Sequence, residues 1–452
     1  MPAPLRTRIM PPGYAGRAVI LCLAACCLVA AASRTARSEN WPQWRGPRYD
    51  GTSHEAHLPL KWSRTSGMAW QCPLPGWANS TPVIWGDAIF VTTQVDNQRL
   101  LLLKLNKATG RIAWTRQVGA GATPNKPVRE KNGDERRHQW FHHDQNFASP
   151  SPVTDGKVVV AHFGNGDLAA YDFRGKQLWY RNLQKDYGDY TVWWGHANSP
   201  VMFHGMVISM CVQDNCADLP GERSPSYLVA HDARTGRERW KTFRVTAARH
   251  EPCDSYTTPI FRQHHARLEM IVFGGQMLDA YDPGSGRQLW YLPNLVGSRT
   301  ISGPVAAGEM IYATQGMRQP LLAVRPGGDG KRPPQDVVWR TAKDTPDCST
   351  PVVSGQWLFM VNNDGTARCF DALTGQQQWK KRLKGDYRAS PLAGDGRIYF
   401  LNNTGLTTVV AAASKFQRLA EDPLDDDTWA SPIASDGRIY IRARKTLYCL
   451  GP

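Results

Sequence analysis

The sequence lacks the short motifs that mark the common hydrolases and nucleotide-driven enzymes. It contains no GxSxG, no HExxH and no Walker loop, so hydrolase and nucleotide-driven reactions have no specific support. The segment GGDG (327–330) is followed by KRPP in place of a helix, which indicates a linker and not a phosphate-binding loop. From the motifs alone, no residue qualifies as catalytic.

Cysteine is scarce outside the first 32 residues. Three of the ten cysteines, Cys22, Cys26 and Cys27, lie in that leader, which leaves seven in the remainder. No CxxC pair is present among them, so no zinc site or CxxCH haem attachment is predicted. An odd number in an exported protein leaves at least one thiol unpaired within the chain, unless it pairs between chains. Cys211 and Cys216, close together on a predicted loop, are the best candidates for a disulfide.

Long apolar runs are confined to the N-terminus. Arg6, Arg8 and Arg17 precede an uncharged run that ends at Ala30–Ala32, a pattern typical of an export signal over residues 1–32. Cleavage near Ala32 would place the protein in the periplasm or cell envelope. The run is short for a membrane span, which needs about 20 residues, although an uncleaved anchor stays open. The segment LAAC (23–26) resembles a lipobox and would instead give a lipid-anchored form.

Charge of one sign is in excess. The formal net charge of +15 suits a polyanionic partner such as anionic lipid, acidic polysaccharide or nucleic acid. The export signal argues against nucleic acid, and the basic segment at 130–140 mixes both signs as a solvated loop does. We therefore expect no nucleic-acid partner, a possible polysaccharide partner, and membrane association only through a lipid or signal anchor.

Tryptophan, by contrast, is abundant, with 17 residues against 13 phenylalanines, and it recurs at a fixed spacing. Segments such as AYDPGSGRQLW (280–290) and CFDALTGQQQW (369–379) are copies of one pattern. Five copies place a glycine four residues before a tryptophan: Gly110 and Trp114, Gly175 and Trp179, Gly236 and Trp240, Gly286 and Trp290, Gly375 and Trp379. The chain therefore contains an internal repeat.

A second recurring element precedes each copy: a small or hydroxyl residue, a proline, and a strand–turn–strand pattern. Proline is tolerated at the first residue of a strand, where its missing N–H costs no ladder bond. The spacing of 40 to 70 residues, with four short strands per unit, predicts an all-β, eight-bladed β-propeller. The eight prolines are Pro82, Pro152, Pro200, Pro259, Pro304, Pro351, Pro391 and Pro432.

The two ends of the propeller are expected to meet in one blade. The last unit stops after three strands, while residues 68–74 before the first unit have the character of a fourth strand. This predicts an N-terminal extension at 33–67 and a propeller at 68–452 with an insertion at 118–148. The predicted fourth-strand anchors are Trp70, Trp114, Trp179, Trp240, Trp290, Trp339, Trp379 and a degenerate Phe416.

An aspartate recurs at the end of the third strand in four copies, with Asn106 in a fifth. A residue that recurs in several blades is not a unique catalytic group. We expect it to cap the N–H groups of a tight turn whose glycine has positive φ. These residues are Asp172, Asp232, Asp282 and Asp371.

The repeat A-x-D-x-x-T-G-x-x-x-W resembles the tryptophan-docking motif of the pyrroloquinoline quinone (PQQ) enzyme-like β-propellers. The resemblance covers the chain from WPQWRGP (41–47) to Cys449. The family contains quinoprotein dehydrogenases and non-enzymatic, BamB-like proteins. Its dehydrogenases hold PQQ against two adjacent disulfide-bonded cysteines, with calcium and a catalytic aspartate beside it. Here the only adjacent pair, Cys26–Cys27, lies in the leader.

The resemblance and the missing pair favour a non-catalytic, exported propeller without a cofactor. It would serve as a protein-binding or scaffolding module of the cell envelope, for example by adding a partner strand to an exposed blade edge. One alternative is a PQQ-dependent quinoprotein dehydrogenase that uses PQQ with calcium to oxidise alcohols or sugars. Another is a carbohydrate-binding propeller.

Two non-repeated segments supply the candidate ligand-binding residues. In the first insertion, His142 and Asp144 are possible metal ligands, but adjacent residues of an extended segment point to opposite sides, so His142 and His143 should not share an ion. In the segment 186–200, Trp193, Trp194 and His196 are candidates for contact with a quinone, sugar or peptide. Both segments are equally compatible with loops that merely cover the core.

Overall fold

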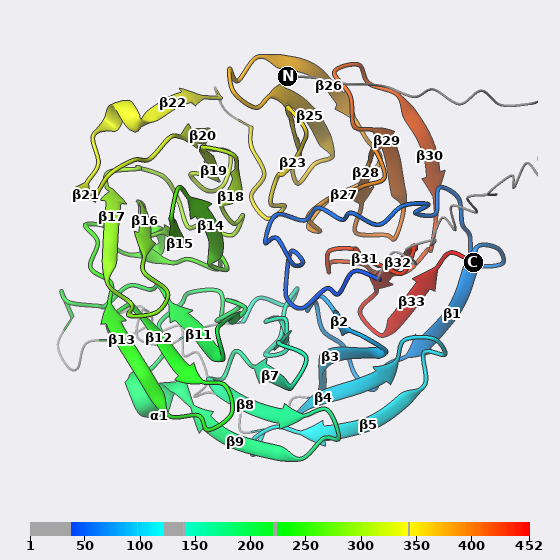
Figure 1. Ribbon diagram of the computed structural model, residues 1–452, viewed down its shortest axis with the longest axis horizontal. Coiled ribbons are helices and arrows are strands. Elements are labelled where there is room, and N and C mark those ends of the chain that lie inside the picture. The colour runs from blue at the N-terminus through cyan, green and yellow to red at the C-terminus, as the bar shows by residue number, and fades with distance from the viewer. Residues whose placement is uncertain (1–37, 97, 122–138, 140, 220–223, 342–343) are drawn as a thin grey trace, which may run out of the picture. The chain divides into compact units, whose positions relative to one another are not determined.

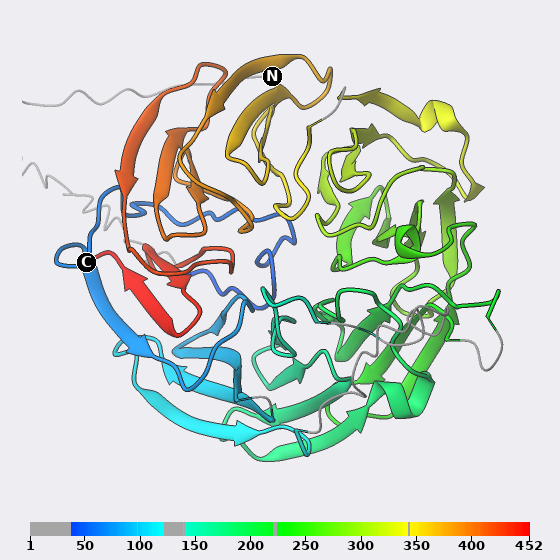
Figure 2. The same cartoon turned by 180° about the vertical axis from the view of Figure 1, so that it is seen from behind.

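The computed structural model describes residues 38–96, 98–121, 139, 141–219, 224–341 and 344–452. Residues 38–452 form one compact unit, and its described strands build eight small antiparallel sheets arranged in a ring (Figure 1, and from behind in Figure 2). The predicted eight-bladed β-propeller is confirmed. None of the helices in the described ranges is long and apolar enough to cross a membrane. The predicted export signal lies outside the described residues.

The first four blades follow the chain from the inner to the outer strand. Blade 1 contains β2 (Val83–Trp85), β3 (Ala88–Val95), β4 (Arg99–Asn106) and β5 (Ile112–Gln117). Blade 2 contains β6 (Val153–Thr154), β7 (Val158–His162), β8 (Asp167–Asp172) and β9 (Gln177–Asn182), followed by α1 (Leu183–Tyr187). Blade 3 contains β10 (Val201–Phe203), β11 (Met206–Cys211), β12 (Tyr227–Asp232) and β13 (Glu238–Phe243). Blade 4 contains β14 (Ile260–His264), β15 (Arg267–Gly274), β16 (Met277–Tyr281) and β17 (Gln288–Leu292), with β21 (Gly330–Lys331) paired in parallel to its edge.

The other four blades repeat this order until the ring closes. Blade 5 contains β18 (Val305–Ala307), β19 (Met310–Thr314), β20 (Leu321–Val324) and β22 (Val337–Arg340). Blade 6 contains β23 (Val352–Ser354), β24 (Trp357–Val361), β25 (Thr366–Asp371) and β26 (Gln377–Arg382). Blade 7 contains β27 (Leu392–Gly394), β28 (Arg397–Leu401), β29 (Thr407–Ala411) and β30 (Arg418–Asp422). Blade 8 contains β31 (Ile433–Ser435), β32 (Arg438–Arg442), β33 (Thr446–Leu450) and β1 (Met68–Pro73).

Blade 8 is assembled from both ends of the propeller, as the sequence predicts. Strand β1 pairs antiparallel with β33, and Trp70 lies opposite Cys449 (Figure 1). The outermost strand of the last blade therefore comes from the N-terminal side of the chain. This pairing connects the first and last repeats by backbone hydrogen bonds, so β33 is covered by a fourth strand as the third strand is in the other blades.

The recurring tryptophans join each blade to the next. Trp179 Nε1 on β9 donates to the carbonyl oxygen of Ala233 in the blade 3 turn at 2.9 Å, and its ring lies against Gly236 of that turn. A Cβ atom at Gly236 would lie 2.7 Å from the ring, and φ there is +70°, so only glycine suits the position. The same indole-to-turn bond is made by Trp70 to Lys107, Trp114 to Phe173, Trp240 to Pro283, Trp339 to Ala372 and Trp379 to Ala413.

The aspartates of the repeat accept hydrogen bonds from the turn that follows them. Asp282 Oδ1 accepts from Ser285 N at 2.7 Å and from the Ser285 hydroxyl at 2.8 Å. Asp232 and Asp371 accept the equivalent pair from Thr235 and Thr374. In the same way Asp172 accepts from Arg174 N and Lys176 N, and Asn106 accepts from Thr109. These bonds satisfy the N–H groups of the turn on which the neighbouring tryptophan docks.

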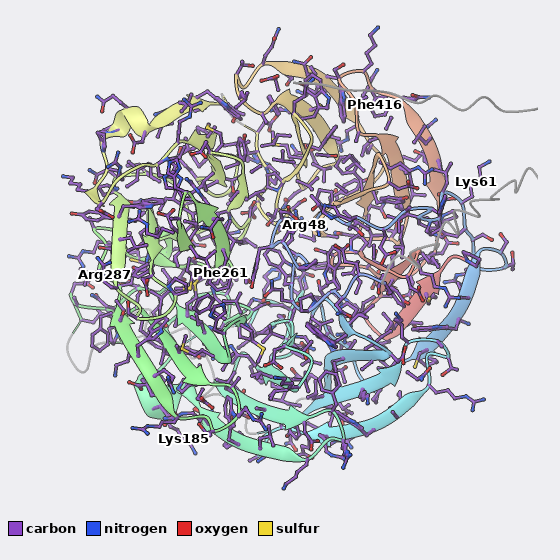
Figure 3. The ribbon with its side chains drawn as sticks, viewed as in Figure 1. Arg48, Lys61, Lys185, Phe261, Arg287 and Phe416 are labelled. Carbon is purple, nitrogen blue, oxygen red and sulfur yellow. The ribbon has the colours of Figure 1, made fainter. Side chains whose placement is uncertain are left out.

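Two junctions depart from the pattern. Trp290 Nε1 donates to Glu269 Oε1 of its own blade at 3.2 Å, and the turn of blade 5 that it would otherwise reach is lengthened by β21. In blade 7 the register position opposite Val409 is Ala420, so the anchor expected at Phe416 is wrong. Phe416 instead lies in the turn at the rim (Figure 3), with its ring centre 5.2 Å from that of Trp379.

The N-terminal extension supplies the apolar bulk that blade 7 lacks. Trp62 is buried, stacks on Tyr399 of β28 with 6.4 Å between ring centres, and its backbone N–H donates to Asp422. Tyr399, Val409 and Ala420 lie side by side on adjacent strands, and Trp62 belongs to the same apolar cluster. A tryptophan from outside the repeat thus packs beside the small residue at Ala420.

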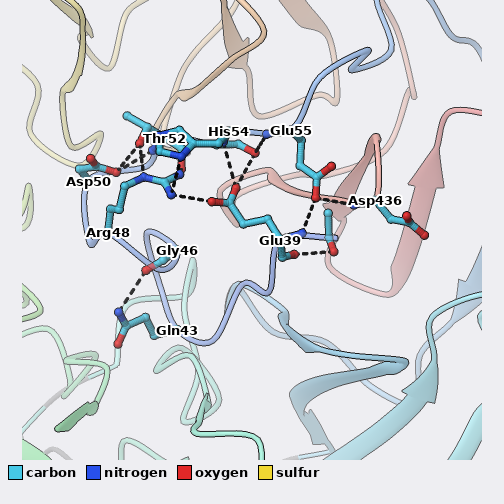
Figure 4. A network of polar contacts seen from close by, with 11 residues as sticks. Glu39, Gln43, Gly46, Arg48, Asp50, Thr52, His54, Glu55 and Asp436 are labelled. Atoms are coloured by element: carbon cyan, nitrogen blue, oxygen red, sulfur yellow. Dashed lines mark hydrogen bonds and ion pairs between the residues drawn. The ribbon is translucent and has the colours of Figure 1, made fainter. Parts of the chain in front are cut away.

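Residues 39–56, here called the plug, cross the centre of the ring (Figure 1). The buried Arg45 donates to the carbonyl oxygens of Pro391 and Pro351, both at 2.8 Å. Around it, the Glu39 carboxylate pairs with Arg48, and Glu55 accepts from the N–H groups of the blade 8 turn (Figure 4). The plug contacts the turns between the first and second strands of blades 8 and 1, through Glu55 and Asn40, and so it lies at that end of the ring.

The hydroxyl residues before the prolines connect the inner strands around the channel. Thr81 N donates to Ser151 Oγ at 2.9 Å, and Ser151 N donates to Ser199 Oγ at 2.9 Å. Equivalent bonds run from Ser199 to Thr258, Gly303 to Thr350, Thr350 to Ser390 and Ser390 to Ser431. We call Thr81, Ser151, Ser199, Thr258, Thr350, Ser390 and Ser431 the hydroxyl ring.

Candidate functional site

The end of the channel away from the plug opens into a pocket of about 440 Å³, here called the mouth. Its walls are loops that lead from the outer strand of one blade to the inner strand of the next. All eight blade junctions contribute a lining residue: Asn79, His142, Trp194, Tyr256, Arg299, Asp347, Arg388 and Trp429. A pocket of this size, lined by aromatic and charged side chains, suits a ligand that carries both apolar and polar groups.

Arg299 organises one wall of the mouth. Its guanidinium pairs with Glu251 at 3.2 Å and with Asp347 at 3.3 Å, and it lies 5.9 Å from the ring centre of Trp194. Trp194 Nε1 donates to the same Glu251 carboxylate at 2.8 Å. Burial raises the pKa of Asp347, although the charge of Arg299 opposes the shift. The aromatic ring and the two carboxylates are thus held in place by one cation.

Arg388 and Trp429 form the facing wall. The Arg388 guanidinium lies 5.5 Å from the ring centre of Trp429, and Arg444 lies 4.9 Å from the same centre. Arg444 also approaches Asp144 at 3.8 Å. Within the described part of the chain, Arg388 makes no ion pair within 4.0 Å, although its charge acts on the Asp347 carboxyl and opposes the rise that burial causes in the pKa of that group.

His142, His143 and Asp144 lie together at the edge of the mouth. His142 Nδ1 is 3.2 Å from one Asp144 carboxylate oxygen, and His143 Nε2 is 3.4 Å from the other. The expectation that the two histidines point to opposite sides is wrong, because the chain turns at 143–144 and brings their ring centres within 4.0 Å. Burial lowers the pKa of His142, while Asp144 opposes that shift.

The three aromatic candidates of segment 186–200 have different positions. Trp194 lines the mouth, and Trp193 packs edge-on against it with 6.3 Å between ring centres. The backbone N–H of Trp193 donates to the buried Asp254 carboxylate. His196 is fully buried away from the mouth: its Nε2 bonds to the carbonyl oxygen of Met210 at 3.0 Å, and its ring stacks on Tyr190. Burial lowers the pKa of His196 to about 4, so it is a neutral core residue.

The disulfide expected between Cys211 and Cys216 is not formed. Cys211 Sγ donates to Gln213 Oε1 at 3.1 Å, and Cys216 Sγ donates to the carbonyl oxygen of Asp214 at 3.8 Å. Both side chains are buried, and burial raises the pKa of Cys211 well above its ordinary value. Proximity in sequence is a poor guide here, because Cys211 belongs to a strand that fixes where its side chain points.

A smaller inner cavity of about 130 Å³ shares lining residues with the mouth, including Arg388 and Trp429. The hydroxyl ring surrounds it, and Trp44 of the plug contributes to its lining. The sequence shows the hydroxyl residues before the prolines only as a repeat. Arg299, Arg388 and Trp429 carry no signal in the sequence, because each is a single residue on a separate loop.

A protein-family model described as outer membrane protein assembly factor BamB matches residues 60–241 and 274–450. The chain belongs to this family. The match covers most of the propeller and has one gap, at the start of blade 4. It confirms the PQQ-like repeat that we inferred from the spacing of glycine and tryptophan. No curated protein matches the sequence.

Solved propellers share the fold at low sequence identity. BamB from Moraxella catarrhalis aligns with a TM-score of 0.57 and 13% identity, over 85% of this chain and 99% of that chain. Quinohemoprotein alcohol dehydrogenase from Comamonas testosteroni aligns with a TM-score of 0.64 and 12% identity, over 91% and 80%. A europium-containing methanol dehydrogenase aligns with a TM-score of 0.53 and 10% identity, over 92% and 98%. These likenesses show the fold, which serves both an assembly factor and dehydrogenases.

Proposed function

We propose that this chain is an exported, non-catalytic binding module of the cell envelope that holds a protein partner at the mouth of its central channel. The observation that carries the proposal is a set of exposed apolar side chains, two of them on loops that also supply residues to the mouth. Val245, Val296 and Met317 are exposed by 83%, 70% and 42%. We call these three residues the apolar rim.

The loops that carry the apolar rim contact one another. Ser298 N donates to the carbonyl oxygen of Gln315 at 3.0 Å, which connects the loop of Val296 to that of Met317. A Cβ atom placed on Gly275 would lie 3.1 Å from Thr246 Oγ1, beside Val245, and Gln276 bonds to the carbonyl oxygen of Gly297. Neighbouring apolar side chains on loops of one face are typical of a surface that a protein partner covers.

The carboxylates of the mouth support a binding role over quinoprotein chemistry. Calcium beside PQQ requires anionic oxygen ligands. At the mouth, Asp347 already pairs with Arg299, and Asp144 is flanked by His142, His143 and Arg444. This set does not offer calcium the oxygen-rich shell that it needs, because Asp347 faces a guanidinium and two of the groups beside Asp144 are imidazoles. His142, His143 and Asp144 lie close enough together to hold one ion, but two imidazoles with one carboxylate suit a transition metal and not calcium. A dehydrogenase acting on alcohols or sugars is therefore the weaker alternative.

Export is supported by the leader pattern at 1–32 and by the family description, which names an assembly factor of the outer membrane. A partner that belongs to the envelope would meet the mouth after export. The outer blade edges offer a second mode of contact, because β21 already adds to the edge of β17 within this chain.

The test is capture of envelope proteins by the purified protein, followed by mass spectrometry. The double variant Val245→Asp with Val296→Asp places charge on the apolar rim, and we expect it to lose the partner that the wild type retains. Leu373→Asp is the matched control, because Leu373 is 61% exposed in a turn at the far end of blade 6. Equal capture by the rim variant and the control, or no protein retained by the wild type, would contradict the proposal.

A further inference from the structure

Most residues that line the inner cavity carry a side-chain hydrogen-bond donor. Of the hydroxyl ring, all members except Thr350 line it. Five of these, Ser151, Ser199, Thr258, Ser390 and Ser431, accept an N–H from the preceding blade through the hydroxyl oxygen. Each hydroxyl proton stays available, because within the described ranges none of the five donates to an acceptor of the chain.

The cavity also carries positive charge, and none of the described residues that line it is a carboxylate. Among the described residues that line it, Arg388 is the only one with a charged side chain. Burial raises the pKa of the Cys348 thiol to about 12, so this lining residue is neutral and adds no negative charge. Asp347 lines the mouth and is paired with Arg299, and it does not line the inner cavity.

Several hydroxyl donors and one guanidinium around a small, partly open space match the needs of an oxyanion. A cavity of about 130 Å³ holds several water molecules or one carboxylate or phosphate group, since one water needs only ~10–15 Å³ by the same measure. The plug contributes Trp44 to its lining, with the Arg45 guanidinium 5.9 Å from the Trp44 ring centre, and the mouth gives access from the other end.

We infer that the inner cavity binds the oxyanion group of a small acidic ligand, with Arg388 as its counter-ion and the hydroxyl ring as its donors. The group is either a free oxyanion such as phosphate or the carboxylate at the end of a chain that enters through the mouth. The site goes beyond the proposed partner function and stands without it, because free phosphate needs no partner protein.

Calorimetric titration of the purified protein tests the site with three probes: inorganic phosphate, N-acetyl-triglycine with a free carboxylate, and the same peptide as its C-terminal amide. We expect saturable, one-site binding of phosphate or of the acid peptide, and at least tenfold weaker binding of the amide. Phosphate alone would identify a free oxyanion as the ligand. Acid-peptide binding that phosphate displaces would identify a chain terminus.

Two variants assign the binding to these residues. Arg388→Gln should weaken binding at least tenfold, and Arg287→Gln, an exposed arginine at the rim of blade 4 (Figure 3), should leave it unchanged. Thr81→Val removes one hydroxyl but keeps the bond from Thr81 N to Ser151, so a severalfold loss would come from the donor and not from unfolding. No saturable binding of either anion, or equal affinities of Arg388→Gln and Arg287→Gln, would overturn the inference.

Because phosphate binding and partner capture are separate measurements, their failures are distinguishable. Loss of capture with intact phosphate binding would remove the proposed function and leave the oxyanion site. Intact capture without anion binding would remove the oxyanion site and leave the proposed function.

Discussion

Arg45 Nη1 donates a hydrogen bond of 2.8 Å to the carbonyl oxygen of Pro391, which lies 346 residues further along the chain. Pro391 opens the inner strand of blade 7, so this bond attaches the plug to the repeat itself. The side chain is buried, and burial lowers the pKa of Arg45 to about 10, which leaves it charged at neutral pH. A buried charge of this kind is tolerated because its N–H groups meet carbonyl oxygens.

Replacement of Arg45 should therefore destabilise the propeller. Arg45→Met removes donors from the carbonyl oxygens of Pro391, Pro351 and Asp50, and we expect a loss of about 3 kcal/mol in the free energy of unfolding. Chemical denaturation measures this loss. Arg111→Met, at an exposed arginine, should change stability by less than about 0.5 kcal/mol, and an equal effect of both variants would argue against the role of the plug.

The docking of tryptophan on glycine predicts a difference between two glycines of nearly equal φ. Gly236 has φ of +70° and faces the Trp179 ring, whereas Gly396 has φ of +69° and nothing within 4 Å of the point where a Cβ atom would lie. Alanine should cost about 1 kcal/mol of backbone strain at either site, and about 1–3 kcal/mol more at Gly236 through overpacking. Equal melting temperatures of the two variants would show that the packing of the Trp179 indole does not require glycine at position 236.

Trp62 should be needed at the junction of blades 7 and 8. Trp62→Ala removes the ring that stacks on Tyr399 beside Ala420, with an expected loss of about 3–5 kcal/mol in the free energy of unfolding. Trp62→Phe keeps a ring in place and should retain most of the stability. If the alanine variant unfolds at the same denaturant concentration as wild type, the extension is not part of this interface.

The buried His196 predicts acid sensitivity. Its pKa is about 4 in the fold, because of burial, against about 6.5 in the unfolded chain. Between these values the unfolded state binds more protons, so stability is complete above pH 6.5 and falls as the pH drops toward 4. From pH 7 to pH 5 the expected loss is about 2 kcal/mol for this residue. His196→Gln should reduce that pH dependence in urea unfolding, and an unchanged dependence would contradict the assignment.

The blade count, the closure by residues 68–73 and the family could be predicted because each depends on a pattern that repeats. Eight prolines and the spacing of glycine to tryptophan are visible in one sequence. The prediction of an anchor at Phe416 was wrong because the repeat is degenerate in blade 7. There the strand register, which the sequence pattern does not show, places Ala420 opposite Val409.

The mouth could be predicted only in part. Trp194, His142 and Asp144 lie on conspicuous insertions, and the structure brings all three to the pocket. Arg299, Arg388 and Trp429 are single residues on ordinary loops, and only closure of the ring brings them together. The expected geometry of His142 and His143 assumed an extended chain and missed the turn at 143–144. His196 is close to Trp194 in sequence, but its side chain is buried in the core between blades 2 and 3.

Titration of the purified protein with PQQ in calcium and again in EDTA, followed by dye reduction with alcohols and sugars, distinguishes a binding module from a quinoprotein dehydrogenase. We expect no substrate-dependent dye reduction, and the same PQQ affinity with and without calcium, because the mouth carboxylates are already paired with cations. Stoichiometric binding of PQQ that requires calcium, together with dye reduction that depends on an alcohol or sugar, would contradict the binding role.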